Sequence, residues 1–335
     1  MIANSLYIEI NNYCNLNCIF CYNESGISKK FIELSPSFFE KKINKFKKIG
    51  IYNIIISGGE PFLHSRIEKF INIMKRYSFI EWHIVTNGTV IKLNVLKKIK
   101  ECKNVILHVS LNGSKEIIDC CIRGEGVFNK TIKFINLLNS LGIRYFVKSV
   151  LTKKNYLDAT KFYDLVVSMG GVPNFTFAFK QGNASNVWDE LVLNNDEKLF
   201  VYKEILKKDS EHHFKNTLPI CLNDCPLVDE ETQIALYINI FGDIFPCQLI
   251  SDNDFKIGTL KSFDEQKIKI NILEIKHRLK ERLNIDYGCK DCFLKINCKK
   301  GCLAKAIAEK ANYLASDDCC NLRRRQFLQL LLEGK

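Results

Sequence analysis

Three cysteines near the start of the chain are spaced for metal chemistry. Cys14, Cys18 and Cys21 follow the pattern C-x3-C-x2-C. Three thiolates on one short loop can hold three irons of a 4Fe-4S cluster and leave the fourth iron without a protein ligand. A structural zinc site would need a fourth ligand nearby, and no Cys or His stands between Cys21 and His64. The spacing therefore favours a cluster with one open iron.

The elements around this motif alternate in a regular way. Helical patterns separate the apolar runs and cover residues 36–49, 65–77, 90–101, 127–141 and 156–169. The β-type apolar runs cover residues 5–11, 53–57, 82–86, 105–110, 144–151 and 174–180. Strands that alternate with helices indicate a parallel sheet with right-handed crossovers. The first part of the chain is therefore predicted to be an α/β fold, a curved sheet or partial (β/α)6 barrel.

Polar and small residues gather where these strands end. The cysteine motif follows the first strand, and Gly58, Gly59 and Glu60 follow the second. Asn87 follows the third strand, and Ser110 ends the fourth. Functional groups of parallel α/β sheets collect at the carboxyl ends of the strands, so we expect these residues to lie close together.

A second region begins near residue 210, where the alternation stops. Nine of the fifteen cysteines fall between residues 221 and 320. Residues 233–240 and 244–247 are predicted to form a β-hairpin, and residues 261–283 a basic helix. We therefore expect two domains, residues 1–210 and residues 211–335.

Composition restricts the cellular setting. The 335 residues are 47% hydrophobic and 26% charged, with a net charge of +12 spread along helices. This charge distribution favours a solvated surface over nucleic-acid binding. No apolar run reaches the roughly 18 residues of a membrane span, and the N-terminus lacks signal-peptide features. We expect a cytoplasmic protein, where a reducing environment directs cysteines toward metal or redox chemistry.

The motif Cys14-Asn-Leu-Asn-Cys18-Ile-Phe-Cys21 resembles that of the radical S-adenosylmethionine (SAM) enzymes, and the resemblance covers about residues 5–210. It implies that the open iron chelates SAM, which an electron splits to methionine and a 5'-deoxyadenosyl radical. It also implies that Gly58, Gly59 and Glu60 bind the methionine amino group, and that Ser110 and Arg123 face the carboxylate and ribose. Phe20 would lie beside adenine, or else pack in the core. Asn87 would contact the nucleoside, or else serve as a turn residue.

The C-terminal cysteines resemble the SPASM extension of peptide-modifying radical enzymes, which carries two auxiliary 4Fe-4S clusters. The resemblance rests on the C-x2-C-x5-C-x3-C run from Cys289 to Cys302 and on Gly242 before Cys247. It implies one cluster on Cys221, Cys225, Cys247 and Cys302. It implies a second cluster on Cys289, Cys292, Cys298 and Cys320, with Cys319 as the alternative to Cys320.

Four cysteines remain after this assignment: Cys102, Cys120, Cys121 and Cys319. A leftover cysteine is most often a small buried hydrophobic residue. Cys120 and Cys121 precede Arg123, so either is a candidate hydrogen-atom donor to a substrate radical. His64, His83 and His108 lie in or beside the sheet and are expected to be structural.

The resemblance implies an enzyme that modifies a peptide made by the ribosome, by thioether or carbon–carbon crosslinking or by epimerisation. One alternative is a sulfatase-type protein maturase, although these enzymes carry Asp directly after the hairpin cysteine, where this chain has Gln248. Alternatives of other classes are a non-catalytic iron–sulfur electron carrier and a zinc-stapled binding module. Expected partners are the peptide, a flavodoxin- or ferredoxin-type reductant and, because ligands begin at residue 14, a separate leader-recognition protein.

Overall fold

The computed structural model describes residues 2–26, 31–215, 217–218, 225–229, 232–285, 289 and 291–332. Its centre is one curved sheet whose strand order is β6-β5-β4-β3-β2-β1-β7-β8-β9. The first six strands are parallel, and neighbours along the chain are neighbours in the sheet. They are β1 (Ala3–Glu9), β2 (Asn53–Ser57), β3 (Glu81–Thr86), β4 (Val105–Ser110), β5 (Tyr145–Leu151) and β6 (Val172–Phe177). The predicted α/β fold with a partial barrel is confirmed.

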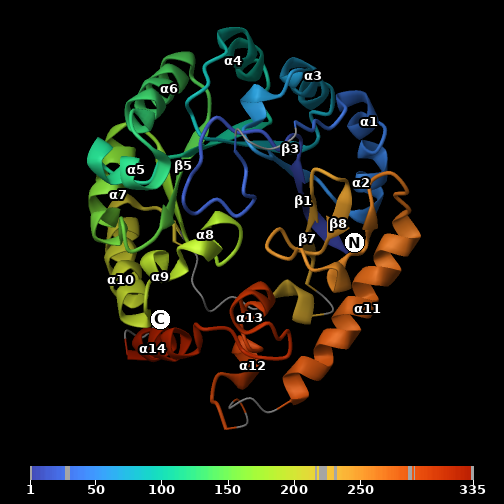
Figure 1. Ribbon diagram of the computed structural model, residues 1–335, viewed down its shortest axis with the longest axis vertical. Coiled ribbons are helices and arrows are strands. Elements are labelled where there is room, and N and C mark those ends of the chain that lie inside the picture. The colour runs from blue at the N-terminus through green and yellow to red at the C-terminus, as the bar shows by residue number, and fades with distance from the viewer. Residues whose placement is uncertain are drawn as a thin grey trace.

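Helices cover the outer face of this sheet (Figure 1). The helices of the first half are α1 (Pro36–Glu40), α2 (Ile43–Ile49), α3 (Ile67–Arg76), α4 (Leu93–Lys100), α5 (Glu116–Arg123), α6 (Val127–Leu141) and α7 (Ala159–Ser168). The single helix expected over residues 36–49 is wrong, because the chain breaks between α1 and α2 at Lys41 and Lys42. Gly50 ends α2 in the left-handed conformation, as its position after the apolar pattern indicated.

The sixth strand begins earlier than the apolar pattern indicated. β6 includes Pro173, which the sequence placed outside a strand. A proline cannot donate to a ladder and is tolerated at an edge, and β6 is the edge strand of the sheet. Edge position is a property of the assembled sheet, so the local pattern alone could not reveal it.

Short helices α8 (Asn183–Asn186) and α9 (Trp188–Leu191) lead into α10 (Asn195–His212). The predicted hairpin is present as β7 (Ile234–Ile238) and β8 (Asp243–Phe245), which pair antiparallel. β9 (Gly258–Thr259) adds to β8, whereas β7 pairs in parallel with β1, so the hairpin extends the sheet of the first half. The division at residue 210 stays a prediction.

The remaining elements lie across the open side of the curved sheet (Figure 1). They are α11 (Glu265–Asn284), α12 (Lys295–Cys298), α13 (Leu303–Lys310) and α14 (Cys320–Leu332). The buried Arg282 of α11 donates to the carbonyl oxygens of Lys300, Gly301 and Ala315. These bonds fix the backbone on both sides of α13, between the cysteines at 298–302 and those at 319–320.

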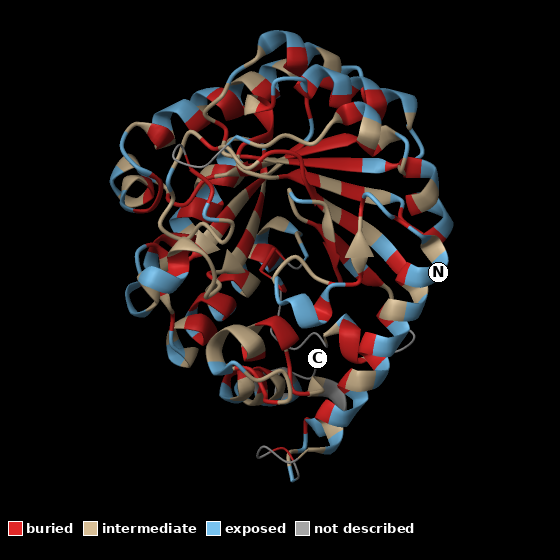
Figure 2. Cartoon of the chain, turned by 45° about the vertical axis from the view of Figure 1, so that its right-hand side comes forward, coloured by how far each residue is buried: buried red, intermediate tan, exposed pale blue. Residues whose placement is uncertain are grey.

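The sheet supplies the largest share of the core, and Figure 2 shows its strands buried while the outer helix faces are exposed. Alternate residues of each strand point to the two faces; Trp82 and Ile84 of β3, for example, are fully buried beneath helices. The opposite, inner face carries polar side chains, which become the wall of a cavity. Among the described residues, no helix is long and apolar enough to cross a membrane.

Candidate functional site

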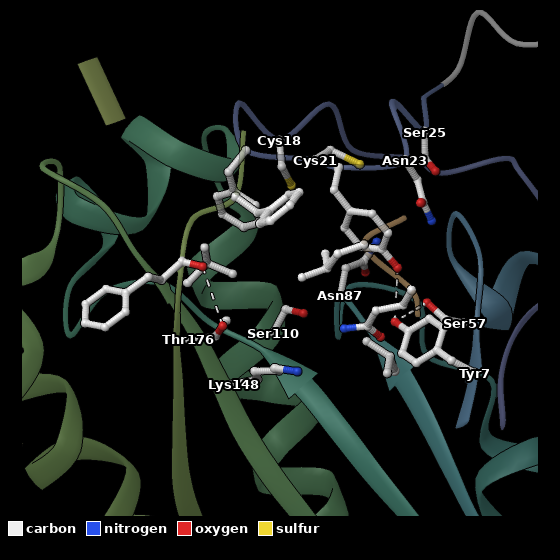
Figure 3. A pocket seen from close by; sticks show the side chains of 18 of the residues that line it. Tyr7, Cys18, Cys21, Asn23, Ser25, Ser57, Asn87, Ser110, Lys148 and Thr176 are labelled. Carbon is white, nitrogen blue, oxygen red and sulfur yellow. Dashed lines mark hydrogen bonds between the residues drawn. The ribbon is translucent and has the colours of Figure 1, made fainter. Parts of the chain in front are cut away.

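A cavity of about 420 Å³ lies between the carboxyl ends of the strands and the loop after β1. Figure 3 shows Cys18 and Cys21 on that loop, above Ser110, Lys148 and Thr176 at the ends of the strands. The wall also includes residues from the C-terminal region, among them Gln248, Cys302 and Lys305. The cavity therefore joins the two halves of the chain.

The first cysteine motif forms one edge of the cavity. Cys14, Cys18 and Cys21 all line it, and the Cys18 thiol lies close enough to the other two to interact with both electrostatically. Burial raises the pKa of Cys14 to about 11 and that of Cys18 to about 12. A metal centre would therefore have to displace the thiol protons, which thiolate-binding iron does. Three converging thiols on one loop fit a cluster with one iron left open.

The two glycines after β2 let this loop approach the sheet. A Cβ at Gly58, whose φ is +142°, would lie 2.2 Å from the Asn11 carbonyl oxygen. A Cβ at Gly59 would lie 2.0 Å from the Tyr13 carbonyl oxygen. Both glycines line the cavity, so their backbone is open to a ligand.

Glu60 lies behind the cavity wall, and its side chain is fully buried. Its carboxylate accepts from the Phe62 N–H at 3.0 Å, the Thr86 hydroxyl at 2.8 Å and the Asn87 N–H at 2.7 Å. Burial raises the pKa of Glu60 to about 7, against the effect of these hydrogen bonds. The geometry makes Glu60 a brace between the ends of β2 and β3, and its predicted contact with the amino group stays untested.

Arg123, the last residue of α5, is buried and reaches the ends of two strands. Its guanidinium donates to the Ser110 carbonyl at 2.6 Å and to the Asn87 carbonyl, and it pairs with Asp119 at 3.4 Å. Its Nε is buried without a hydrogen-bond partner among the described residues, although the side chain lines the cavity. This orphaned donor fits an anionic group such as the carboxylate of SAM.

The other predicted cofactor residues also reach the cavity. Phe20, Asn87 and Ser110 line it together with Arg123. The Asn87 amide lies 3.6 Å from the Cys14 sulfur and donates to the Asn15 side chain at 3.0 Å. Asn87 thus connects the end of β3 to the cysteine loop.

The vicinal cysteines, Cys120 and Cys121, are not brought to the site. Both thiols donate to the Ile117 carbonyl of the same helix, at 3.3 and 3.1 Å. Neither residue lines the cavity, and Cys121 is exposed. The geometry therefore gives no support to a hydrogen-atom donor at these positions.

Sequence reasoning missed Lys148 on β5, which lines the cavity beside Ser110 (Figure 3). It lies between the buried residues Val147 and Ser149, so strand alternation turns it to the inner face. A charged residue in the middle of an otherwise uncharged strand was the available signal.

Cysteines of the C-terminal region form a second group at the cavity. Cys247 interacts electrostatically with Cys225 and Cys302, and burial raises its pKa to about 12. Cys302 lines the same cavity as the first cysteine motif. These three were expected to share a cluster with Cys221, which lies outside the described residues.

A third group of cysteines gathers around the start of α14. Arg324 hydrogen-bonds the Cys292 thiol and interacts electrostatically with Cys289 and Cys320. Cys320 also acts on Cys298, whose pKa is raised mainly by burial. This is the set expected for the second auxiliary cluster.

The alternative residue, Cys319, faces other partners. Its sulfur lies 3.2 Å from the Lys305 amine, 3.8 Å from the Lys198 amine and 3.2 Å from the Asp318 carboxylate. The choice between Cys319 and Cys320 stays a prediction, and these contacts favour Cys320.

Comparison with known proteins identifies the first half of the chain. Residues 8–165 match the radical SAM superfamily. The chain is 23% identical to the mycofactocin maturase MftC of Mycolicibacterium smegmatis, over 88% of this chain and 77% of that protein. It is 27% identical to a cysteine-type anaerobic sulfatase-maturating enzyme of Clostridium novyi, over 86% of this chain and 84% of that one.

The fold is similar to that of Streptococcus suis SuiB bound to SAM. The TM-score is 0.75 at 17% identity, covering 95% of this chain and 76% of SuiB. SuiB bound to its precursor peptide SuiA is also similar, with a TM-score of 0.70. The shared architecture includes the C-terminal region, since the match extends well beyond the radical SAM domain.

Proposed function

This chain is a radical SAM enzyme, and we propose that it modifies a peptide by way of a 5'-deoxyadenosyl radical. The observation that supports this most directly is that Cys14, Cys18, Cys21 and Cys302 all line the same cavity. A substrate in that cavity would lie between two iron–sulfur sites. The likeness to a mycofactocin maturase and to SuiB bound to the precursor peptide SuiA supports a peptide as this substrate.

When bound, a cluster on the first three cysteines would supply the electron that splits SAM to methionine and the radical. The chain's own residues bind and orient the cofactor. The backbone of Gly58 and Gly59 is open toward its amino group, and the Arg123 Nε is a donor for its carboxylate. Phe20 offers an apolar surface for adenine, and apolar side chains such as Leu16 and Phe179 exclude water from the cavity.

Two auxiliary 4Fe-4S clusters belong to this proposal. One would be held by Cys221, Cys225, Cys247 and Cys302, and the other by Cys289, Cys292, Cys298 and Cys320. Three cubane clusters give about 12 irons per chain after anaerobic reconstitution. A variant with alanine at Cys14, Cys18 and Cys21 should keep about 8 irons, and a wild-type content near 4 would refute the auxiliary clusters.

Crosslinking of the peptide, by a thioether or a carbon–carbon bond, fits the cavity better than sulfatase-type maturation. The relative from Clostridium novyi favours the second activity, but Gln248 lines the cavity where such enzymes carry Asp. An amide cannot accept a proton as that carboxylate would. Epimerisation is the third possibility, and mass spectrometry separates it from crosslinking because it leaves the peptide mass unchanged.

Partners complete the proposal. The net charge of +12 is suited to an acidic flavodoxin- or ferredoxin-type reductant, and a separate protein would deliver the leader of the peptide. Association with the reductant should weaken as salt rises. Binding that does not change with salt would remove the electrostatic part of this proposal.

The test is reductive cleavage of SAM by the anaerobically reconstituted enzyme. We expect 5'-deoxyadenosine and methionine from the wild type and neither from Cys18→Ala. Cys102→Ala is the matched control, because Cys102 is a buried cysteine whose thiol donates to the Lys98 carbonyl, away from the cavity. Incubation with a small peptide encoded beside the enzyme should then give a modified product. Cleavage retained by Cys18→Ala would overturn the assignment.

A further inference from the structure

The inner face of the sheet carries a row of ionisable side chains that the proposed function does not use. Glu81 and His83 lie on β3, His108 on β4 and Lys148 on β5. The Glu81 carboxylate lies 3.0 Å from His83 Nε2, and His83 Nδ1 lies 2.8 Å from His108 Nε2. Lys148 interacts electrostatically with His108 and lines the cavity. The row therefore runs from the exposed Glu81 side chain to the cavity wall.

The two histidines in this row are suited to pass a proton. Burial lowers the pKa of His108 to about 3 and also lowers that of His83. Both rings are therefore neutral at physiological pH, and a neutral imidazole has one nitrogen that donates and one that accepts. The His108 ring stacks on Phe146, with the centroids 5.3 Å apart, which fixes its orientation.

Lys148 is the unpaired base of the cavity wall. Among the residues that the structure describes, none forms an ion pair or hydrogen bond with its amine, and burial lowers its pKa. Other ionisable groups of the wall are committed: Asp317 pairs with Arg323 at 2.9 Å, and Arg123 pairs with Asp119. The other titratable groups that line the wall with Lys148 are the thiols of Cys14, Cys18, Cys21 and Cys302, the Lys305 amine, and the phenols of Tyr7 and Tyr22. Burial raises the pKa of both phenols.

Closure of a crosslink has to release a proton in this cavity. After a hydrogen atom leaves a substrate carbon, attack by a thiol sulfur or an aromatic carbon forms one C–S or C–C bond. The same step breaks one S–H or C–H bond and releases one electron and one proton. The electron passes to a one-electron oxidant of the iron–sulfur class, and the proton needs a base within reach.

We propose that Lys148 accepts this proton, that a water bridges the gap between its amine and His108, and that the row His108, His83 and Glu81 returns the proton to solvent at the opposite edge of the sheet. The proposal rests on the crosslinking activity proposed above. It explains how the chain removes a proton although Gln248 offers no base. Lys148 acts on the substrate as a catalytic residue, whereas His108 and His83 act through Lys148.

The test compares Lys148→Met and Lys148→Arg in the reconstituted enzyme with a substrate peptide deuterated at its carbon-bound positions. Lys154→Met is the matched control, because Lys154 lies on the loop after β5 and pairs with Glu190 at the surface. Both Lys148 variants should transfer deuterium to 5'-deoxyadenosine at close to the wild-type rate. Their yield of closed product should fall by about 100-fold, the usual effect of losing a general base.

Three outcomes would overturn the proposal. Full product from Lys148→Arg would mean that the positive charge, not the base, matters. Loss of deuterium transfer in Lys148→Met would mean that Lys148 binds the cofactor or positions the peptide. Unchanged product in Lys148→Met would mean that the proton leaves by another route.

A second readout does not depend on the crosslinking activity. Competitive labelling of the reconstituted protein with acetic anhydride across pH reports the pKa of each lysine amine. We expect Lys148 to titrate below the usual range of a lysine amine, and its pKa to change in His108→Phe, which keeps the stacking on Phe146. If the wild type modifies no peptide, the proposed function fails, while an ordinary pKa at Lys148 would refute the base itself.

Discussion

Replacing Glu60 by alanine should destabilise the junction between β2 and β3. The Glu60 carboxylate accepts hydrogen bonds from the Phe62 N–H, the Thr86 hydroxyl and the Asn87 N–H, and no part of the side chain reaches solvent. Alanine leaves the two backbone donors buried without an acceptor. At about 1–3 kcal/mol for each, the free energy of unfolding should fall by about 2–6 kcal/mol.

The loss should also reach the cofactor site, because Asn87 connects the two. The backbone carbonyl of Asn87 accepts from Arg123, and the side-chain amide of Asn87 lies 3.6 Å from the Cys14 sulfur. Once Asn87 N–H loses its acceptor, both contacts loosen. We therefore expect weaker binding of SAM together with lower stability, and the two effects should move in parallel.

Glu60→Gln gives a graded version of this prediction. Glutamine keeps one oxygen for Phe62 and Thr86, but its amide group would face the Asn87 N–H, so one donor is lost at a cost of about 1–3 kcal/mol. Because burial raises the pKa of Glu60 to about 7, the folded state binds its proton more tightly than the unfolded state. The stability from this group is full below the unfolded pKa and is lost as pH rises through about 7. Glutamine should remove that pH dependence.

Anaerobic urea unfolding of the reconstituted proteins, with SAM binding by equilibrium dialysis, measures both effects. Glu101→Ala is the matched control, since Glu101 is exposed and pairs with Lys75 on the surface. If Glu60→Ala unfolds at the same urea concentration as Glu101→Ala but no longer binds SAM, the carboxylate touches the cofactor directly. The bracing role would then be wrong.

Three further predictions concern Arg123 and four of the cysteines. Arg123→Met should lower the free energy of unfolding by about 3–5 kcal/mol, because it leaves Asp119 buried and unpaired, and adding Asp119→Asn should restore part of the loss in urea unfolding. Cys320→Ala should cost more iron than Cys319→Ala when bound iron is assayed after reconstitution, and the reverse order would move the ligand to Cys319. Replacing Cys120 or Cys121 by serine should leave the yield and the stereochemistry of the peptide product unchanged. A change of either quantity in one of these variants would restore the hypothesis that the cysteine donates a hydrogen atom.

Much of the site could be predicted because its motifs are local. The spacing of Cys14, Cys18 and Cys21 is fixed within one loop, and Gly58 and Gly59 are required by close approach of backbone to backbone. Parallel strands bring their carboxyl ends to one edge, so motif order along the chain translates directly into proximity. Strand and helix positions followed from periodicity for the same reason.

What could not be predicted depends on contacts between distant parts of the chain. The sequence indicates a hairpin after residue 233, but only the assembled sheet decides that β7 pairs with β1 rather than forming a separate unit. Likewise, the partners of Arg123 on Ser110 and Asn87 are 13 and 36 residues away. The order of the motifs assigns Arg123 to the cofactor, but it could not show that the Arg123 guanidinium already donates to backbone carbonyls within the fold.

Lys148 shows how the two kinds of information combine. Alternation along β5 turns Lys148 away from the helices and toward the inner face, which is a local inference. Whether such a lysine is paired depends on the neighbouring strands. Ser110 of β4 lies opposite Lys148 in the sheet, His108 lies opposite Phe146, and no carboxylate of the described residues pairs with the amine. An unpaired buried amine costs stability at neutral pH, because its proton is bound more weakly in the folded state. Lys148→Met should therefore raise the melting temperature at pH 7 by more than at pH 10, and an equal shift at both would mean that the amine carries no such cost.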